Sequence, residues 1–140
     1  MINDASVREF VQWANQSGRP AHQTYMRLVC HCLDAVMPAL PQIAVNAYST
    51  ARAYWLRNEG SAPDLDQAQR ACWEYLQSIG SSTKLDSPAV ISVRAVICAL
   101  YAEPSDEDFD SDTLDWFVVL LNKLGDYSAA FAKAFEAVRG

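Results

Sequence analysis

Hydrophobic residues recur at intervals of three and four along almost the whole chain, and prolines and glycines interrupt this pattern at regular points. Such spacing places the hydrophobic side chains on one face of an α-helix. No segment combines strict alternation of hydrophobic and polar residues with the turn residues that a β-hairpin needs. The sequence therefore predicts an all-α protein.

Capping residues and helix breakers divide the chain into predicted helices. Ser6, with Glu9 three residues later, is a predicted capping box for the first helix, which ends at Gly18. The second helix is expected to begin near Pro20 or Ala21. It should end at Pro38, and a third helix should cover about 41–59. A fourth helix is expected from an N-cap at Asp64 to Gly80, and a fifth is expected to begin at Ser87 and Pro88. A sixth should run from near Ser111 or Asp112 through the hydrophobic residues 116–121, and a seventh should cover about 126–138.

The length of 140 residues fits one domain, so residues 1–140 are expected to form a single, compact, irregular bundle of six or seven helices. The fifth predicted helix is hydrophobic on nearly every side, which is typical of a central position in a fold. Trp13 to Gly18 and Trp55 to Gly60 share one spacing, 42 residues apart. This period leaves a short HEAT-like stack of helical hairpins as the alternative architecture.

Negative charge is concentrated in the last third of the chain. Residues 1–102 contain eight Lys or Arg and eight Asp or Glu, whereas residues 103–140 contain three basic and nine acidic residues, which accounts for the net charge of −6. A nucleic-acid-binding protein needs a basic surface, and so does a protein that binds an anionic membrane. We therefore expect neither nucleic acid nor membrane as a partner.

Seven of these acids lie within thirteen residues that contain no Lys or Arg, and the first part of this stretch, 103–112, is predicted to be an acidic loop. Like charges this close repel one another, and a basic protein partner would relieve that repulsion. Two aromatic side chains, Phe109 and Trp116, flank the acids and offer anchors for an interface. The candidate partner-binding residues are Glu103, Asp106, Glu107, Asp108, Phe109, Asp110, Asp112 and Asp115.

Other residues suggest chemistry less specifically. Cys30, His31 and Cys32 are zinc-ligand types, but residues 30 and 32 point to different sides of a helix, so buried core thiols are the favoured interpretation. The acidic loop lacks the glycine and glutamate of a calcium-binding EF-hand. Arg94 is expected to pair inside the protein, with Asp34 as one candidate, or to anchor an anion. We predict no catalytic residue, metal or cofactor.

Location is predicted from the same features. The longest nearly hydrophobic stretch, residues 89–102, is too short to span a bilayer, and the first residues show no pattern of a cleaved secretion signal. The four cysteines have no disulfide-framework spacing. We expect a cytoplasmic protein.

Two adjoining segments carry a resemblance to a group of known proteins. Residues 53–60, AYWLRNEG, and 64–76, DLDQAQRACWEYL, together with the helix pattern over about 20–121 and the acidic loop, resemble small all-helical bacterial immunity proteins of polymorphic toxin systems (type VI or contact-dependent). The resemblance implies a cytoplasmic protein that binds a cognate toxin and blocks it without chemistry of its own. No binding residue follows from it.

Composition and resemblance lead to one expectation for function, a non-enzymatic binding protein that docks an acidic surface on a basic partner. Two alternatives remain open at this level. One is a small helical enzyme or metal-binding protein that uses Cys30, His31 or the acidic loop. The other is a helical-repeat adaptor with a continuous concave surface.

Overall fold

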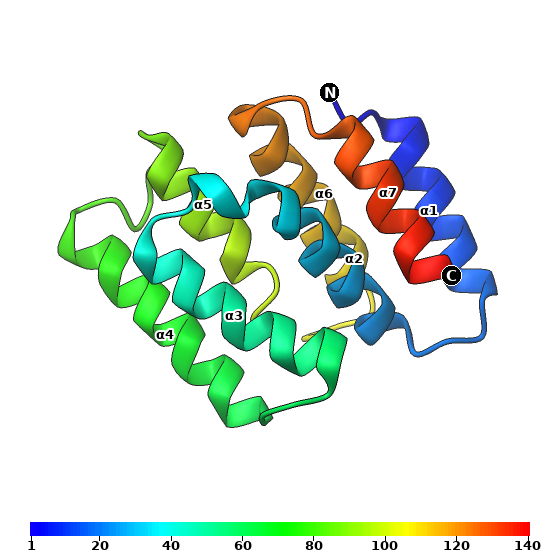
Figure 1. Cartoon of the computed structure of the whole chain (residues 1–140), viewed down its shortest axis with the longest axis horizontal. Helices are drawn as coiled ribbons and strands as arrows, with labels where there is room; N and C mark the ends of the chain where they lie inside the picture. The colour runs from blue at the N-terminus through cyan, green and yellow to red at the C-terminus, as the bar shows by residue number, and fades with distance from the viewer.

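A computed structural model describes the whole chain, residues 1–140, and confirms the all-α prediction: it contains seven α-helices and no strand (Figure 1). The helices are α1 (Asp4–Gln16), α2 (Ala21–Val36), α3 (Gln42–Arg57), α4 (Ala62–Ser78), α5 (Pro88–Ile97), α6 (Phe109–Leu124) and α7 (Ser128–Arg139), with a short 3₁₀ helix, η1 (Met37–Ala39), between α2 and α3.

Helix α2 lies in the middle of the bundle and packs against α1, α3, α5, α6 and α7. The α3–α4 pair lies on one side of it, and α1 and α7 lie together on the other side (Figure 1). The N-terminus is fixed to α6, because the side chain of Asn122 accepts a hydrogen bond from the Ile2 amide and donates one to the Ile2 carbonyl, both 3.0 Å long. Contacts between helices so distant in sequence support a compact bundle over the HEAT-like alternative, in which each repeat contacts only its neighbours.

The helix starts follow the predicted capping logic, with shifts of a few residues. At α5 the prediction is confirmed: Ser87 is the N-cap and accepts from the Val90 amide at 3.2 Å. At α1 the predicted box is wrong, because Asn3 is the N-cap and accepts from the Ser6 amide at 2.8 Å. An asparagine cap with non-helical backbone geometry starts the helix about one turn earlier and satisfies a free amide of its first turn, that of Ser6.

The predicted N-cap of α4 is also displaced. Ser61 caps this helix, and Asp64, now at the third helical position, accepts a 2.9 Å hydrogen bond from the Ser61 amide. This reciprocal arrangement is a capping box. Just before it, Gly60 has a φ of 85°, which favours glycine, and a Cβ there would lie 3.1 Å from the Asp64 carboxylate. The turn between α3 and α4 therefore depends on a residue without a side chain.

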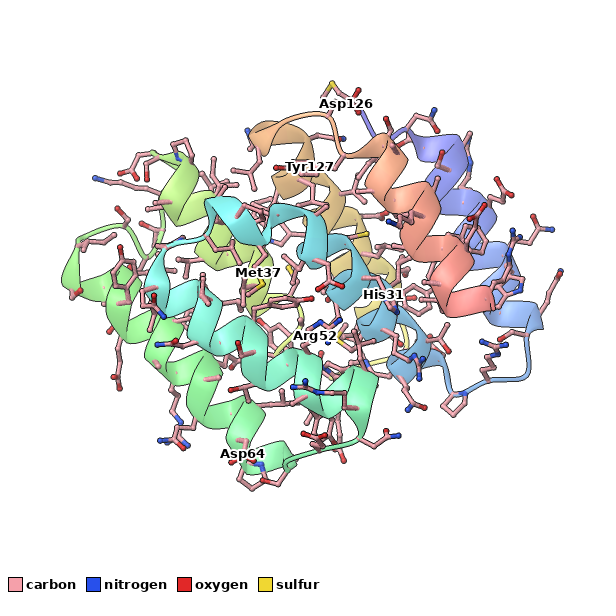
Figure 2. The ribbon with its side chains drawn as sticks, in the orientation of Figure 1. His31, Met37, Arg52, Asp64, Asp126 and Tyr127 are labelled. Atoms are coloured by element: carbon pink, nitrogen blue, oxygen red, sulfur yellow. The ribbon has the colours of Figure 1, made fainter.

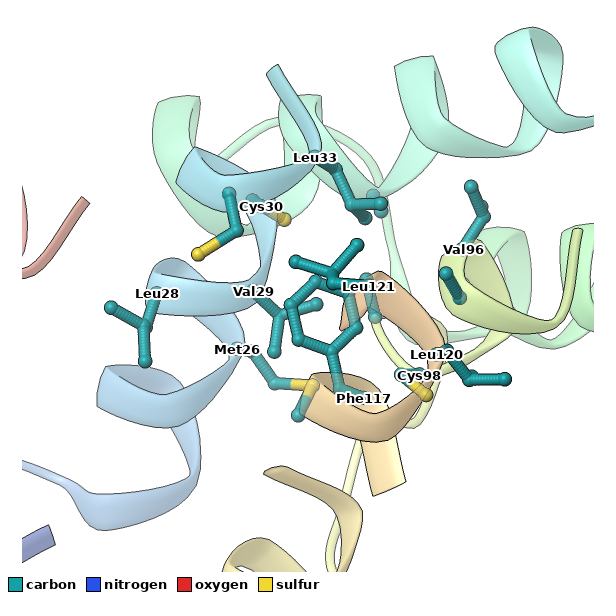
Figure 3. Close-up of a cluster of buried hydrophobic side chains, with 14 of the residues drawn as sticks. Met26, Leu28, Val29, Cys30, Leu33, Val96, Cys98, Phe117, Leu120 and Leu121 are labelled. Carbon is teal, nitrogen blue, oxygen red and sulfur yellow. The ribbon is translucent and has the colours of Figure 1, made fainter. Parts of the chain in front are cut away.

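One hydrophobic core runs through all seven helices and contains 38 buried hydrophobic residues. Helix α5, predicted to be central, has seven buried residues among its ten. The four cysteines are free thiols in this core. Figure 3 shows Cys30 and Cys98 among Leu33, Phe117 and Leu120. The core thus places helix α6, and the acidic residues that precede and open it, against α5 and α2.

Candidate functional site

The acidic residues lie in the α5–α6 connection and in the first two turns of α6. We refer to residues 103–115 as the acidic segment. The loop was expected to extend to residue 112, but α6 already begins at Phe109, so three of the seven acids, Asp110, Asp112 and Asp115, are helical. The earlier start has a physical reason, because acidic side chains near a helix N-terminus interact favourably with the positive end of the helix dipole.

Six of the seven acids expose their side chains to solvent. The structure contains four ion pairs, and none of them joins one of these six to a lysine or arginine. Their negative charge is therefore unanswered by the chain itself. The exposed acids are Glu103, Asp106, Glu107, Asp108, Asp112 and Asp115.

The pKa of the Asp115 carboxyl group reflects this uncompensated negative charge. Its pKa is raised above the ordinary value of 3.8, first by partial burial and then by the negative charges of Asp112 and Asp4. Asp4 opens α1, far away in the sequence, and no pattern in the sequence indicated that it lies near the acidic segment. The negative surface is therefore wider than the segment from which it was predicted.

Phe109 and Asp110 are the two candidates that the fold half-buries. The Phe109 ring packs edge-on against Tyr101, with ring centres 5.0 Å apart. The Asp110 carboxylate binds His22 of α2, with 2.6 Å between Asp110 Oδ1 and His22 Nδ1. These two side chains are engaged inside the protein, whereas none of the six exposed acids binds a lysine or arginine.

Exposed hydrophobic side chains adjoin the acidic segment on α6. Trp116 is 37% exposed and Val119 is 43% exposed, and their spacing of three places them on the same helix face. Large hydrophobic side chains that stay exposed beside charged residues are typical of a protein interface. The acidic segment is thus continuous with a small hydrophobic surface.

Arg94 packs against Trp116 of this surface. Its guanidinium carbon lies 5.0 Å from the ring centre of Trp73 and 5.7 Å from that of Trp116. Both distances fit cation–π contacts. The three side chains line a cleft of about 200 Å³ that also reaches Tyr101 and Asp112. The Arg94 stack therefore orients Trp116 at the edge of the acidic segment.

The pairing suggested between Arg94 and Asp34 is wrong. Asp34 instead accepts a hydrogen bond from Arg52 Nε of α3 at 3.1 Å, and a second, short one from the Tyr48 hydroxyl. Arg52 thus reaches from α3 to α2 (Figure 2). Arg94 has no carboxylate within ion-pair distance, and its guanidinium is stabilised by aromatic faces instead.

The thiols behave as core groups. Burial raises the pKa of Cys72 to about 11 and that of Cys98 to about 12, and it raises the pKa of Cys30 and Cys32 further. A thiol that binds metal or attacks a substrate needs the opposite shift. His31, between two of these cysteines, has a lowered pKa, mainly because of its partial burial. No three His, Cys, Asp or Glu side chains come together in a way that would hold a metal ion.

A larger hollow of about 550 Å³ lies between α3 and α4, away from the acidic segment. Its walls are mostly small side chains, among them Ala47, Ala53, Ala68 and Ala71, and its rim includes Asp64. The groove was not predicted from the sequence. The alanines on the facing sides of the two helices were the one feature that could have indicated it. The space stays open because these side chains are too short to fill the gap between the two helices.

No helix combines the length and the hydrophobicity needed to cross a bilayer. Comparison of the chain with models of known protein families, with curated proteins and with solved structures finds no match.

Proposed function

We propose that this chain is a non-enzymatic binding protein that docks a basic protein partner on its acidic segment, and that it serves as an immunity protein that inhibits a cognate bacterial toxin. The observation that carries the proposal is the set of six exposed carboxylates without a lysine or arginine partner. The toxin as partner follows from the resemblance of residues 53–76 and from the chemistry of the surface.

Unanswered charge of this density is costly for the chain alone. Repulsion among like charges destabilises the compact state, and a positively charged partner removes that repulsion. A concentrated negative surface also attracts such a partner over a distance of about 10 Å at moderate salt, and it repels other acidic proteins. The acidic segment therefore favours fast and selective encounter with a basic protein.

Trp116 and Val119 supply what charge alone does not. Tryptophan and arginine are the residues that most often dominate the binding energy of an interface. Trp116 is held by the Arg94 guanidinium, which also lies over Trp73, so docking would restrict the motion of Trp116 little further. In this proposal the acids guide the encounter and Trp116 retains the partner.

A toxin that acts on nucleic acid fits this surface well. Such a protein needs a positively charged face to bind phosphates. An inhibitor that presents carboxylates at similar density can occupy that face and block it. An immunity protein with this role works in the cytoplasm of the cell that it protects, which is the location we propose.

Co-expression with the product of the neighbouring gene tests the proposal. If the proposal holds, that product is toxic when it is expressed alone, and this chain restores growth. The triple variant Glu103→Gln, Glu107→Gln, Asp108→Asn should lose most of the protection, because three exposed charges of the docking surface are removed.

A matched control removes three exposed acids elsewhere, with Glu9→Gln, Glu74→Gln and Glu136→Gln. It changes the net charge by the same amount and should keep full protection. A harmless neighbouring product contradicts the immunity role. Equal protection by the triple variant and the control contradicts the acidic segment as the docking surface.

A further inference from the structure

The His22 imidazole binds the chain on both sides of the loop between α5 and α6, which carries four of the exposed acids. His22 Nε2 lies 2.6 Å from the carbonyl oxygen of Tyr101, before the segment. His22 Nδ1 lies 2.6 Å from Asp110 Oδ1, in the first turn of α6. The His22 side chain is 13% exposed and that of Asp110 15% exposed, so water competes little for these contacts. Residues 102–108 therefore form a loop whose two flanks, Tyr101 and the first turn of α6, are joined through α2.

The two contacts set how many protons this arrangement needs. A carbonyl oxygen only accepts, so Nε2 must carry a hydrogen toward Tyr101. An ionised carboxylate also only accepts, so the contact with Nδ1 needs a second proton. A neutral imidazole with its hydrogen on Nε2 would turn a lone pair toward the Asp110 carboxylate. The closed arrangement thus requires a proton between His22 and Asp110.

No other titratable side chain forms a hydrogen bond with the His22 ring. Helix α3 contributes the Trp55 ring, 5.5 Å away and edge-on, and the loop contributes Phe109 at 6.0 Å. Tyr25, one turn along α2, lies near the same acids, since burial and then the charges of Asp110 and Asp115 raise the pKa of its hydroxyl. Asp110 is the only charged side chain bonded to the imidazole ring.

We infer that His22 is a proton-dependent latch for the acidic segment. When the imidazole is protonated, it binds both ends of the loop, and the exposed carboxylates are held in one arrangement. When it loses the proton, the bond to Asp110 is lost and the segment loosens. The closed arrangement is stabilised while both ring nitrogens of His22 carry a hydrogen, and it is weakened when the ring releases one of them. The use of the latch, in presenting a docking surface, rests on the proposed function.

The latch can be measured in the isolated chain by NMR and hydrogen exchange. The chain has two histidines, so a His31→Gln background leaves the His22 ring as the only imidazole. From about pH 5 to about pH 9, the resonances of the His22 ring nitrogens and those of the amides of residues 102, 103 and 105–109 should shift together, Pro104 having no amide hydrogen. Exchange of the Phe109 and Asp112 amides, corrected for its intrinsic pH dependence, should accelerate at least about tenfold over the same range.

Two variants distinguish the latch from a purely structural contact. Asp110→Asn supplies an amide that can donate to a neutral Nδ1, so the loop should stay closed and its pH dependence should disappear. His22→Gln reaches at most one of the two ends, so exchange at Phe109 and Asp112 should be about tenfold faster already at acidic pH.

The inference is overturned if the amides of residues 102, 103 and 105–109 do not follow the resonances of the His22 ring, or if Asp110→Asn keeps the full pH dependence. None of these measurements involves a partner. A failed latch with intact toxin rescue therefore removes the inference alone, and a working latch with a harmless neighbouring product removes the proposed function alone.

Discussion

Raising the pH should destabilise this protein strongly, because four neutral thiols lie in its core. Each folded-state pKa lies above the ordinary thiol value of 9.0. The folded chain therefore holds four protons that the unfolded chain releases as pH passes about 9. Since the folded values are raised, this contribution to stability is fully present below about pH 8 and declines as pH rises toward the folded values.

The size of the loss follows from these values. At about pH 10, an unfolded thiol gains between about 1 and 2 kcal/mol from ionisation that a folded thiol does not share. Four thiols together should lower the free energy of unfolding by at most about 5–6 kcal/mol between about pH 8 and about pH 10. A domain of this size has about 5–15 kcal/mol in total, so the protein should come close to unfolding.

Urea unfolding at both pH values, in the presence of reductant and followed by circular dichroism, measures this loss. The variant Cys98→Ala serves as a control, because it removes one of the four groups and should reduce the pH-dependent loss by about a quarter, between about 1 and 2 kcal/mol. An unchanged free energy of unfolding between the two pH values would refute the reasoning. So would thiols that react quickly with an alkylating reagent in the folded protein, since reactive cysteines are ionised and accessible.

Two further substitutions test the fold. Trp55→Phe removes the indole donor that binds the Ala99 carbonyl at 2.8 Å, and it should lower the free energy of unfolding by about 1–3 kcal/mol in urea denaturation; a loss below about 0.5 kcal/mol contradicts this role. Asp64→Ala breaks the capping box of α4 and should cost about 0.5–2 kcal/mol in the same assay, whereas Asp64→Asn, which keeps an acceptor for the Ser61 amide, should cost less.

The helices were predictable because their signals are local. Ser87 and Pro88 specify the start of α5 by a hydrogen bond and a backbone angle within one turn. The start of α6 was less predictable, because the contacts of Phe109 and Asp110 that accompany it involve Tyr101 and the distant His22. A helix start that depends on a contact with a residue so distant in the sequence cannot be predicted from the residues next to it.

The candidate surface was likewise predictable only in part. The density of acids is visible in the sequence, and six of them are exposed as a solvated segment should be. Which of them the fold engages was not visible, since Asp110 and His22 are 88 residues apart. The partners of Arg94 were missed for a related reason: an arginine in a hydrophobic helix suggests a carboxylate, but the aromatic faces of Trp73 and Trp116 stabilise its charge instead.

The rate of association between this chain and the neighbouring gene product, measured by stopped flow at low and high salt, tests the docking surface most directly. The account predicts that the unmodified chain associates at least about tenfold faster at low salt than at high salt. The variant Glu103→Gln, Glu107→Gln, Asp108→Asn should associate about tenfold more slowly at low salt and lose most of the salt dependence, with its dissociation rate little changed. Association of that variant at the rate and salt dependence of the unmodified chain would contradict the account.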